Sequence, residues 1–442
     1  MQSSPVSRRT GSEMGNLGIL LGIYLLMCTA PIAELLDTYL HINFSEVLIT
    51  WVLVTAGVLF SGRADRFLQV PLARWWVAIG VLLFLASVFS IYRRQSVTLI
   101  LSYLLRFHTM PFLICAVALT LSNVRTLIFW PGMASLTLTA VCILLGQYSD
   151  GRLNIPGTTL GNPNDLGFLL LFSSTYALIF ISSRSTFVRG LWLVSLPITL
   201  NFVLRTGSRA NFVTVLAALA VVVAIVPAKA KIGLIATALV VTIVLAFVVP
   251  ASTWERLTTI SLDADRELRE NPDRSSELGS QIARVELQKR AYQLALENPL
   301  FGVGPLMFPQ AADQMVRRDT GVKTAWQNPH NVYLQIAAEN GIPCAALYIL
   351  SFVMCWQMNY RCYKVSSRVP RLAAARSQSF CLALATVIYA FGIIFCNFAY
   401  EAFWSVLVGL SSANYLAMLA EIKSTSGPVV AGPTAGFMTS PS

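Results

Sequence analysis

His330 is the residue of this chain best placed for acid–base chemistry. It lies in the run AWQNPHNVYLQIAAENGIP, where the polar segment 251–328 runs back into an apolar stretch. The Asn328-Pro329 pair predicts that a helix begins here, so His330 would feel the positive end of the helix dipole. That field disfavours the imidazolium form and would keep a neutral base available near pH 7. The alternative is a buried or interfacial histidine that only forms hydrogen bonds.

Arginines near the ends of apolar stretches are the candidates for binding a diphosphate. Arg205 and Arg209, in VLRTGSRANF, end one apolar stretch and begin the next, so both guanidinium groups could reach one cavity. Arg284, in the polar segment, is the third candidate. Planar guanidinium groups of fixed charge match the oxygens of a diphosphate. The alternative for Arg205 and Arg209 is contact with lipid headgroups at the membrane interface.

Polar side chains at other predicted helix starts are candidates for binding substrate. In LNIPGTTLGNPNDLGFLL, Asn162 and Asp165 most simply cap a helix, and the alternative is hydrogen bonding to sugar hydroxyls. Asn331 directly follows His330 and is a further candidate. Glu401, in NFAYEAFW, is the candidate for a second base, although a glutamate at a helix start also suits the dipole without catalysis.

The remaining basic residues within or beside apolar stretches carry a weaker signal. Arg93 and Arg94, in IYRRQS, could attract an anionic lipid head, and simple headgroup contact is the alternative. Arg106 should face the interior of the protein, in a structural or a substrate-binding role. His41 and His108 stand at no such boundary, so we assign structural roles to them.

The sequence lacks the motifs of nucleotide and metal sites. It has no Walker A motif, no GxGxxG and no D-x-D pair in the expected outer loops, and its eight cysteines show no C-x-x-C spacing. We therefore expect neither a metal nor a cofactor. An enzyme of this kind would use an already activated donor and would stabilise the leaving diphosphate with arginines.

The composition predicts an all-α membrane protein. The 442 residues are 55% hydrophobic and only 12% charged, with a mean hydropathy of +0.65, which leaves too little polar surface for a soluble globule. A helix needs roughly 20 apolar residues to cross the hydrocarbon core. About twelve stretches approach that length and predict a polytopic bundle of transmembrane helices: 17–34, 45–62, 73–91, 97–121, 124–147, 164–182, 187–204, 210–227, 231–250, 330–358, 378–397 and 402–420.

Charge patterning predicts the orientation of these helices. Lysine and arginine are concentrated in the loops on the N-terminal side, which the positive-inside rule assigns to the cytoplasm. The net charge of +11 therefore reflects topology, so we expect membrane lipids and no nucleic acid as partners. The expected organisation is a cytoplasmic tail over 1–16, spans over 17–250, an outer helical segment over 251–328, spans over 329–421 and a disordered cytoplasmic tail over 422–442.

Two features of the segments around His330 predict local structure. In QIARVELQKRAYQLALENP, an amphipathic helix is expected with Ile282, Val285, Tyr292 and Leu296 near one face, lying on the membrane surface or capping the bundle. The following apolar stretch holds polar residues at membrane depth and the sequence ENGIP, which should break its helix. Polar groups at that depth need a wet cavity or protein partners, so we expect a water-accessible funnel on the outer side.

Four sequence elements together resemble the O-antigen ligase and polymerase superfamily of bacterial envelope enzymes. They are GNPNDLG, the RTGSRAN loop, an outer helix with a central arginine before ENPLFGVGP, and NPHNVYLQIAAENGIP. The motifs cover roughly residues 158–345, and the hydropathy pattern covers most of the chain. Among the members, the chain looks most like a lipopolysaccharide O-antigen ligase, because its outer segment is short and no large C-terminal domain follows.

The resemblance implies a bundle of the C-type glycosyltransferase kind in the bacterial inner membrane, with its active site facing the periplasm. Such an enzyme moves glycan from undecaprenyl pyrophosphate to a sugar hydroxyl of lipid A-core without a metal, by a displacement expected to invert the anomeric centre. The family's essential histidine matches His330, its cavity arginines match Arg205 or Arg209, and its long-loop arginine matches Arg284. The histidine would act as the base, and the arginines would take up charge on the diphosphate.

Two other functions remain open at this stage. An O-antigen polymerase would use the same donor and extend another lipid-linked repeat. A transporter of anionic lipid or solute, from a different class, would use the arginines only for binding. Transporters commonly have two related halves, and the sequence contains no repeat of that kind.

Overall fold

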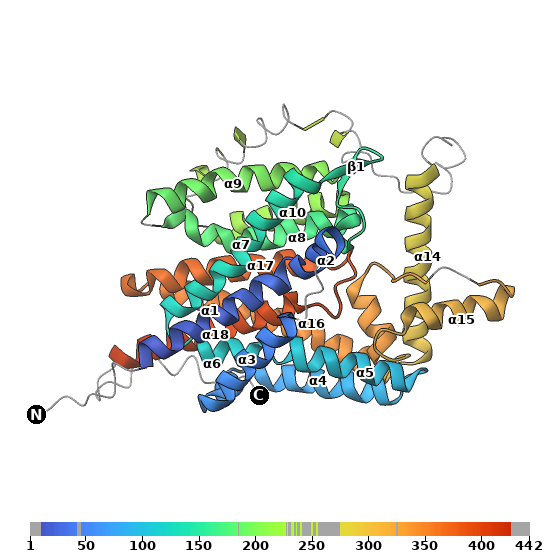
Figure 1. Cartoon of the computed structure of the whole chain (residues 1–442), viewed down its shortest axis with the longest axis horizontal. Coiled ribbons are helices and arrows are strands. Elements are labelled where there is room, and N and C mark those ends of the chain that lie inside the picture. The colour runs from blue at the N-terminus through green and yellow to red at the C-terminus, as the bar shows by residue number, and fades with distance from the viewer. Residues whose placement is uncertain are drawn as a thin grey trace, which may run out of the picture.

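The chain folds into a bundle of helices, seen in the computed structural model in Figure 1. The structure describes residues 10–41, 46–183, 185–226, 228, 231–233, 236, 239–240, 249–250, 253–254, 275–323 and 326–425. Its main elements are α1 (Thr10–Thr29), α2 (Ile32–Leu40), α3 (Glu46–Phe60), α4 (Ala73–Val88), α5 (Arg93–Tyr103), α6 (Met110–Val117), α7 (Leu121–Leu145), β1 (Gln147–Ser149), β2 (Arg152–Asn154), α8 (Pro163–Ala177), α9 (Thr186–Arg205), α10 (Arg209–Ile225), α14 (Ser275–Glu297), α15 (Phe308–Thr320), α16 (Val332–Ser366), α17 (Ala373–Gly392) and α18 (Ala402–Thr425). A π-helical turn, Leu104–His108, joins α5 to α6, and β1 and β2 form a short antiparallel hairpin.

The prediction of an all-α polytopic membrane protein is confirmed. Within the described residues, seven helices are long and apolar enough to cross a membrane, and the bent pair of α1 and α2 would make an eighth. Three shorter apolar helices, Ile49–Phe60, Ala73–Val88 and Arg209–Ile225, coincide with further expected spans. The expected span 231–250 lies largely outside the described residues. The sequence thus predicted where helices form, but several are too short for a straight crossing of the full hydrocarbon core.

Aromatic packing between α16, α17 and α18 forms the centre of the bundle. Trp404 of α18 is fully buried, and its ring centre lies 4.0 Å from that of Phe352 and 5.6 Å from that of Tyr389. The indole N–H of Trp404 donates to Ser351 Oγ at 3.1 Å. In a lipid environment, close packing and hydrogen bonds between helices provide the association energy. These contacts hold the three helices that carry the segments described below.

α16 is broken at Gly341, as its ENGIP sequence predicts. Gly341 has φ 84° and ψ 163°, a backbone conformation that L side chains rarely adopt. A Cβ at this position would lie 2.2 Å from the carbonyl oxygen of Leu300. Pro343 contributes to the break because it cannot donate a backbone hydrogen bond within the helix.

The segment between α14 and α15 fills the space beside this break. Three backbone hydrogen bonds join it to α16: Val303 N–H to Ala338 O at 2.9 Å, Gly304 N–H to Glu339 O at 2.9 Å, and Ile342 N–H to Pro299 O at 2.8 Å. The Glu339 carboxylate also accepts from the Phe308 N–H at 3.0 Å. Backbone groups that a broken helix exposes need such partners in a membrane protein. The LFGVGP motif therefore completes the broken helix.

α14 crosses the end of the bundle, transverse to most of the long helices in Figure 1. Its buried side chains Leu287, Ala291, Leu294 and Ala295 form a small core with the α14–α15 connection and with Ala338 of α16. Residues spaced by three or four lie on one helical face. Arg284, three residues before Leu287, is therefore on the packed side of α14.

Most of the apolar face predicted for α14 does not pack on α16. Val285, Tyr292 and Leu296 are exposed, with relative exposures of 47%, 57% and 56%. The face buried on α16 uses two alanines, which the sequence pattern did not mark. Small side chains allow two helices to approach closely, and this contact, rather than the largest apolar residues, determines which face is buried.

The break in α16 makes a stability prediction. Gly341→Ala should lower the thermal unfolding midpoint in detergent. Alanine at this positive φ carries a backbone strain of roughly 1–3 kcal/mol, and its Cβ would collide with the Leu300 carbonyl oxygen. Gly190→Ala, in α9, is the control, since a Cβ there meets nothing within 4 Å. It should leave the midpoint unchanged or slightly higher. An unchanged midpoint for Gly341→Ala would show that the break is not obligatory.

Candidate functional site

His330 lies just before α16 and not within it. It has a left-handed backbone conformation, φ 52°, and the helix begins at Val332 with Asn331 as its N-cap. The predicted first-turn position of His330 is therefore wrong. The Asn331 carboxamide oxygen accepts from the Leu334 N–H at 3.1 Å, so this candidate for substrate binding caps the helix. A non-glycine residue at positive φ is held there by its surroundings.

Asn397, in the connection 393–401 between α17 and α18, keeps His330 in this backbone conformation through two hydrogen bonds. Its Oδ1 accepts from the backbone N–H of His330 at 2.9 Å. Its Nδ2 lies 2.9 Å from His330 Nδ1. One side chain thus contacts both the backbone and the imidazole of the histidine. Sequence analysis missed Asn397, because the 67 positions that separate it from His330 carry no pattern linking them.

Arg284 is the charged neighbour of this histidine, and Asp165 is in turn a charged neighbour of Arg284. Burial lowers the pKa of His330 to about 4, and the positive charge of Arg284 adds to the shift. Burial also lowers the pKa of Arg284, while the Asp165 carboxylate opposes that change. The structure therefore brings three sequence candidates, from α8, α14 and the start of α16, into one cluster. The low pKa keeps the imidazole neutral near pH 7, and the causes are burial first and the nearby Arg284 second.

The GNPNDLG motif builds the start of α8. Asn162 caps the helix by accepting the Asn164 N–H at 3.0 Å, as the simpler sequence interpretation predicts. Asn211 of α10 donates to the Asn164 carbonyl oxygen at 2.9 Å. A Cβ at Gly167 would lie 2.3 Å from Asn211 Nδ2, so this glycine permits the close approach of α10. The motif thus joins the start of α8 to the RTGSRAN loop.

Arg205 is the last residue of the neighbouring helix α9, just before the α9–α10 loop. It donates to the Tyr148 hydroxyl at 2.9 Å and to Asn201 Oδ1 at 3.2 Å. Arg209 begins α10 and is half-buried. Arg152 of β2, which sequence analysis did not single out, donates to Asn164 Oδ1 and to the Thr206 carbonyl oxygen, both at 2.9 Å. These contacts put the loop beside α8, at the same end of the bundle as Arg284.

A buried network links the 393–401 connection to the break in α16. The Tyr400 hydroxyl donates to Glu339 Oε2 at 2.6 Å, and Asn340 Nδ2 donates to the Tyr400 hydroxyl at 2.7 Å. Val332 N–H donates to the Ile393 carbonyl oxygen at 2.9 Å. The connection that carries Asn397 is therefore fixed to α16 on both sides of Asn397, at Ile393 and at Tyr400.

Glu401 lies at the end of this connection, where its charged neighbours are Glu34 of α2 and Arg106. Desolvation by the surrounding protein raises the pKa of the Glu401 carboxyl to about 7, and the negative charge of Glu34 adds to the shift. Glu401 is an exposed residue, so solvent screening reduces that shift. Glu34 is held by Thr159, whose N–H and hydroxyl donate to it at 2.7 and 2.6 Å.

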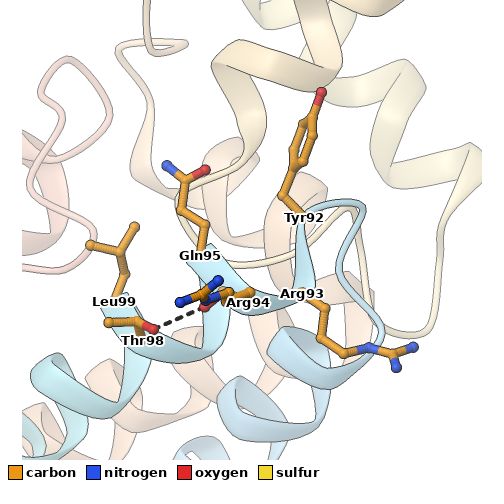
Figure 2. A pocket seen from close by; sticks show the side chains of 6 residues that line it. All are labelled: Tyr92, Arg93, Arg94, Gln95, Thr98 and Leu99. Atoms are coloured by element: carbon orange, nitrogen blue, oxygen red, sulfur yellow. Dashed lines mark hydrogen bonds between the residues drawn. The ribbon is translucent and has the colours of Figure 1, made fainter.

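Arg93 and Arg94 occupy a different place at the start of α5. They line an open hollow of about 650 Å³ with Tyr92, Gln95, Thr98 and Leu99, shown in Figure 2. The Arg93 guanidinium donates to the Val88 carbonyl oxygen at 2.6 Å. Neither His330 nor Arg284 lines this hollow. The two arginines therefore do not join the cluster around the histidine.

The other two histidines lie in separate surroundings, and the structure offers no metal site among the described residues. His41 ends α2 in a left-handed conformation, and His108 stacks on Trp76 with ring centres 4.5 Å apart. In the described part of the chain, no group of three or more His, Cys, Asp or Glu side chains could hold a metal ion.

Comparison with known families gives one match. Residues 194–349, about a third of the chain, match the family model described as O-antigen ligase. The matched region contains Arg205, Arg209, Arg284 and His330, whereas Asp165 and Asn397 lie outside it. No curated protein matches the chain.

The electrostatics of the cluster can be tested without substrate. Arg284→Met should raise the pKa of His330 from about 4 towards its usual 6.5, because a nearby positive charge is removed while burial remains. The ¹⁵N chemical shifts of the imidazole, followed against pH by NMR, report this pKa. Arg290→Met, a change on the same helix at a residue paired with Glu286, should leave it unchanged. An equal change in the pKa of His330 in both variants would contradict the assignment of Arg284 as its charged neighbour.

Proposed function

Because the chain belongs to the O-antigen ligase and polymerase superfamily, we propose that it transfers O-antigen glycan from undecaprenyl pyrophosphate to a sugar hydroxyl of lipid A-core. Membership in this superfamily makes it a multi-pass membrane enzyme of the glycosyl-transfer type. The proposal adds the donor, the acceptor and the reacting residues. The reaction takes place on the periplasmic side of the inner membrane, at the end of the bundle that carries α14.

The cluster of His330, Arg284 and Asp165 is the observation that carries the proposal. A neutral imidazole beside a partly buried guanidinium is suited to a reaction in which negative charge develops on a departing diphosphate. Burial strengthens such interactions, because water screens them less. Arg205 and Arg209 approach from the α9–α10 loop, which contacts α8 near Asp165. They are proposed to bind the outer phosphate.

The proposed reaction is a direct displacement. The acceptor oxygen forms a bond to the anomeric carbon while the bond from that carbon to the diphosphate oxygen breaks. The bonding pair leaves with the diphosphate, where Arg284 stabilises the charge. The proton of the acceptor passes to a base, which the sequence assigns to His330 with Glu401 as the second candidate. Attack opposite the leaving group inverts the anomeric centre.

An O-antigen polymerase is the alternative within the same superfamily. It uses the same donor, so the cluster does not distinguish it from the ligase. Deletion of the gene separates the two functions. A ligase deletion leaves lipid A-core without long glycan while undecaprenyl-linked polymer accumulates, and a polymerase deletion leaves only single repeats on the carrier.

Reconstitution tests the reaction itself. Purified protein with undecaprenyl-pyrophosphoryl glycan and lipid A-core should give a ladder of products on a gel, also in the presence of EDTA. His330→Ala should lower the rate by about 10²–10⁴-fold. Arg284→Lys should lower it about 10²-fold, because a point charge replaces a planar fork that matches phosphate oxygens.

Arg318→Ala is the matched control for these variants. Arg318 is exposed in the last turn of α15, so its loss should leave the rate unchanged. A transporter has no transfer to lose. Purified protein that binds the donor but forms no product would favour that class, and full activity in His330→Ala would remove the histidine from the mechanism.

A further inference from the structure

We propose that Asn397 fixes His330 in the tautomer that carries its proton on Nε2, so that the imidazole acts as a hydrogen-bond donor towards the diphosphate. The inference rests on the proposed function and refines it. It also changes the role that the sequence predicts for His330, since a proton on Nε2 leaves this nitrogen unable to accept another.

The orientation of the Asn397 amide follows from the backbone. The His330 N–H can only donate, so the atom of Asn397 that contacts it at 2.9 Å must be the carbonyl oxygen. The amide NH₂ is then the group 2.9 Å from His330 Nδ1. Because this NH₂ can also only donate, Nδ1 must present its lone pair. A neutral imidazole with a lone pair on Nδ1 carries its proton on Nε2.

The Asn397 contact is rigid enough to impose this choice. Its connection is held by the Val332 N–H to Ile393 O hydrogen bond at 2.9 Å on one side. On the other side, the Tyr400 hydroxyl binds the buried Glu339 carboxylate at 2.6 Å. Rotating the amide by 180° would bring two donors together at the backbone of His330, whichever tautomer the ring adopts. That would leave the His330 N–H without an acceptor.

The consequence concerns the nitrogen that remains available to substrate. Nδ1 is occupied by Asn397, and within the described residues Nε2 has no hydrogen-bond partner. A donor at Nε2, together with the Arg284 guanidinium that interacts electrostatically with this imidazole, offers N–H groups that match phosphate oxygens. Low basicity suits a donor and not a base, since an effective base has a pKa near the working pH. The pKa of His330, about 4, lies well below it. The proton of the acceptor must then pass to a base other than His330, and Glu401 is the remaining candidate from the sequence.

The tautomer can be observed directly by NMR. The chain has only three histidines, so ¹⁵N-histidine labelling gives few signals, and His330→Gln identifies those of His330. The wild-type protein should show a one-bond N–H coupling at Nε2 and an unprotonated Nδ1. The opposite assignment would overturn the proposal, whatever the outcome of the activity assays.

Asn397→Asp separates a donor from a base. The carboxylate still accepts the His330 N–H, but it also accepts from the ring, so the proton moves to Nδ1 and Nε2 gains a lone pair. If Nε2 must donate, kcat should fall about 10²–10³-fold, the cost of losing one donor to a developing charge, with a smaller change in KM. If His330 is the base, the same variant should keep or raise kcat, because the carboxylate makes Nε2 more basic.

Two measurements guard this test against misfolding and against failure of the proposed function. The signals of His108, which stacks on Trp76 far from the 393–401 connection in sequence, should be unchanged in a folded Asn397→Asp variant. Asn397→Leu removes both contacts and should give a mixture of tautomers with reduced kcat. If the wild-type protein transfers no glycan, the proposed function is refuted but the tautomer is not, because NMR determines the tautomer without any activity assay.

Discussion

The break in α16 at Gly341 is the constraint on which the rest of this structure depends. A transmembrane helix interrupted at membrane depth exposes backbone groups that lipid cannot satisfy. Here the backbone of residues 299–304 satisfies them, through hydrogen bonds at Ala338, Glu339 and Ile342. Filling the break ties the end of α14 to α16, which brings Arg284 towards the start of α16. The ENPLFGVGP and AENGIP motifs therefore act as one structural unit, although α15 separates them in the chain.

Charge balance around His330 follows from the same arrangement. Arg284 lies on the packed side of α14, where burial opposes its charge and Asp165 favours it. The positive charge in turn opposes protonation of His330. An anionic ligand would find a neutral imidazole and a guanidinium already in place, so little reorganisation would accompany binding. The carboxylate of Asp165 keeps this charge tolerable in the absence of ligand, because an unpaired buried charge is costly.

Sequence reasoning predicted more of the fold than of the site. Apolar length and turn residues located the helices in the described part of the chain, and the Asn-Gly-Ile-Pro run located the break in α16. The sequence did not show which face of α14 packs on α16: the contact uses Ala291 and Ala295, while Tyr292 and Leu296 stay exposed. Likewise His330 was expected inside a helix, but Asn331 is the better cap and displaces the helix start to Val332. In both cases tertiary contacts decide between local alternatives that the sequence pattern does not distinguish.

The sequence by itself determined the class of protein, the helices and the residue types available for chemistry, since these depend on composition and local periodicity. Only the tertiary structure decided which side chains meet. Asn397 and Arg152 carried no signal in the sequence, because a single asparagine or arginine looks the same whether it faces lipid heads or another segment. His330 and Asp165 each come near Arg284 because α8, α14 and the start of α16 pack at one end of the bundle. That outcome depends on the shapes of distant surfaces, and no local pattern in one chain encodes it.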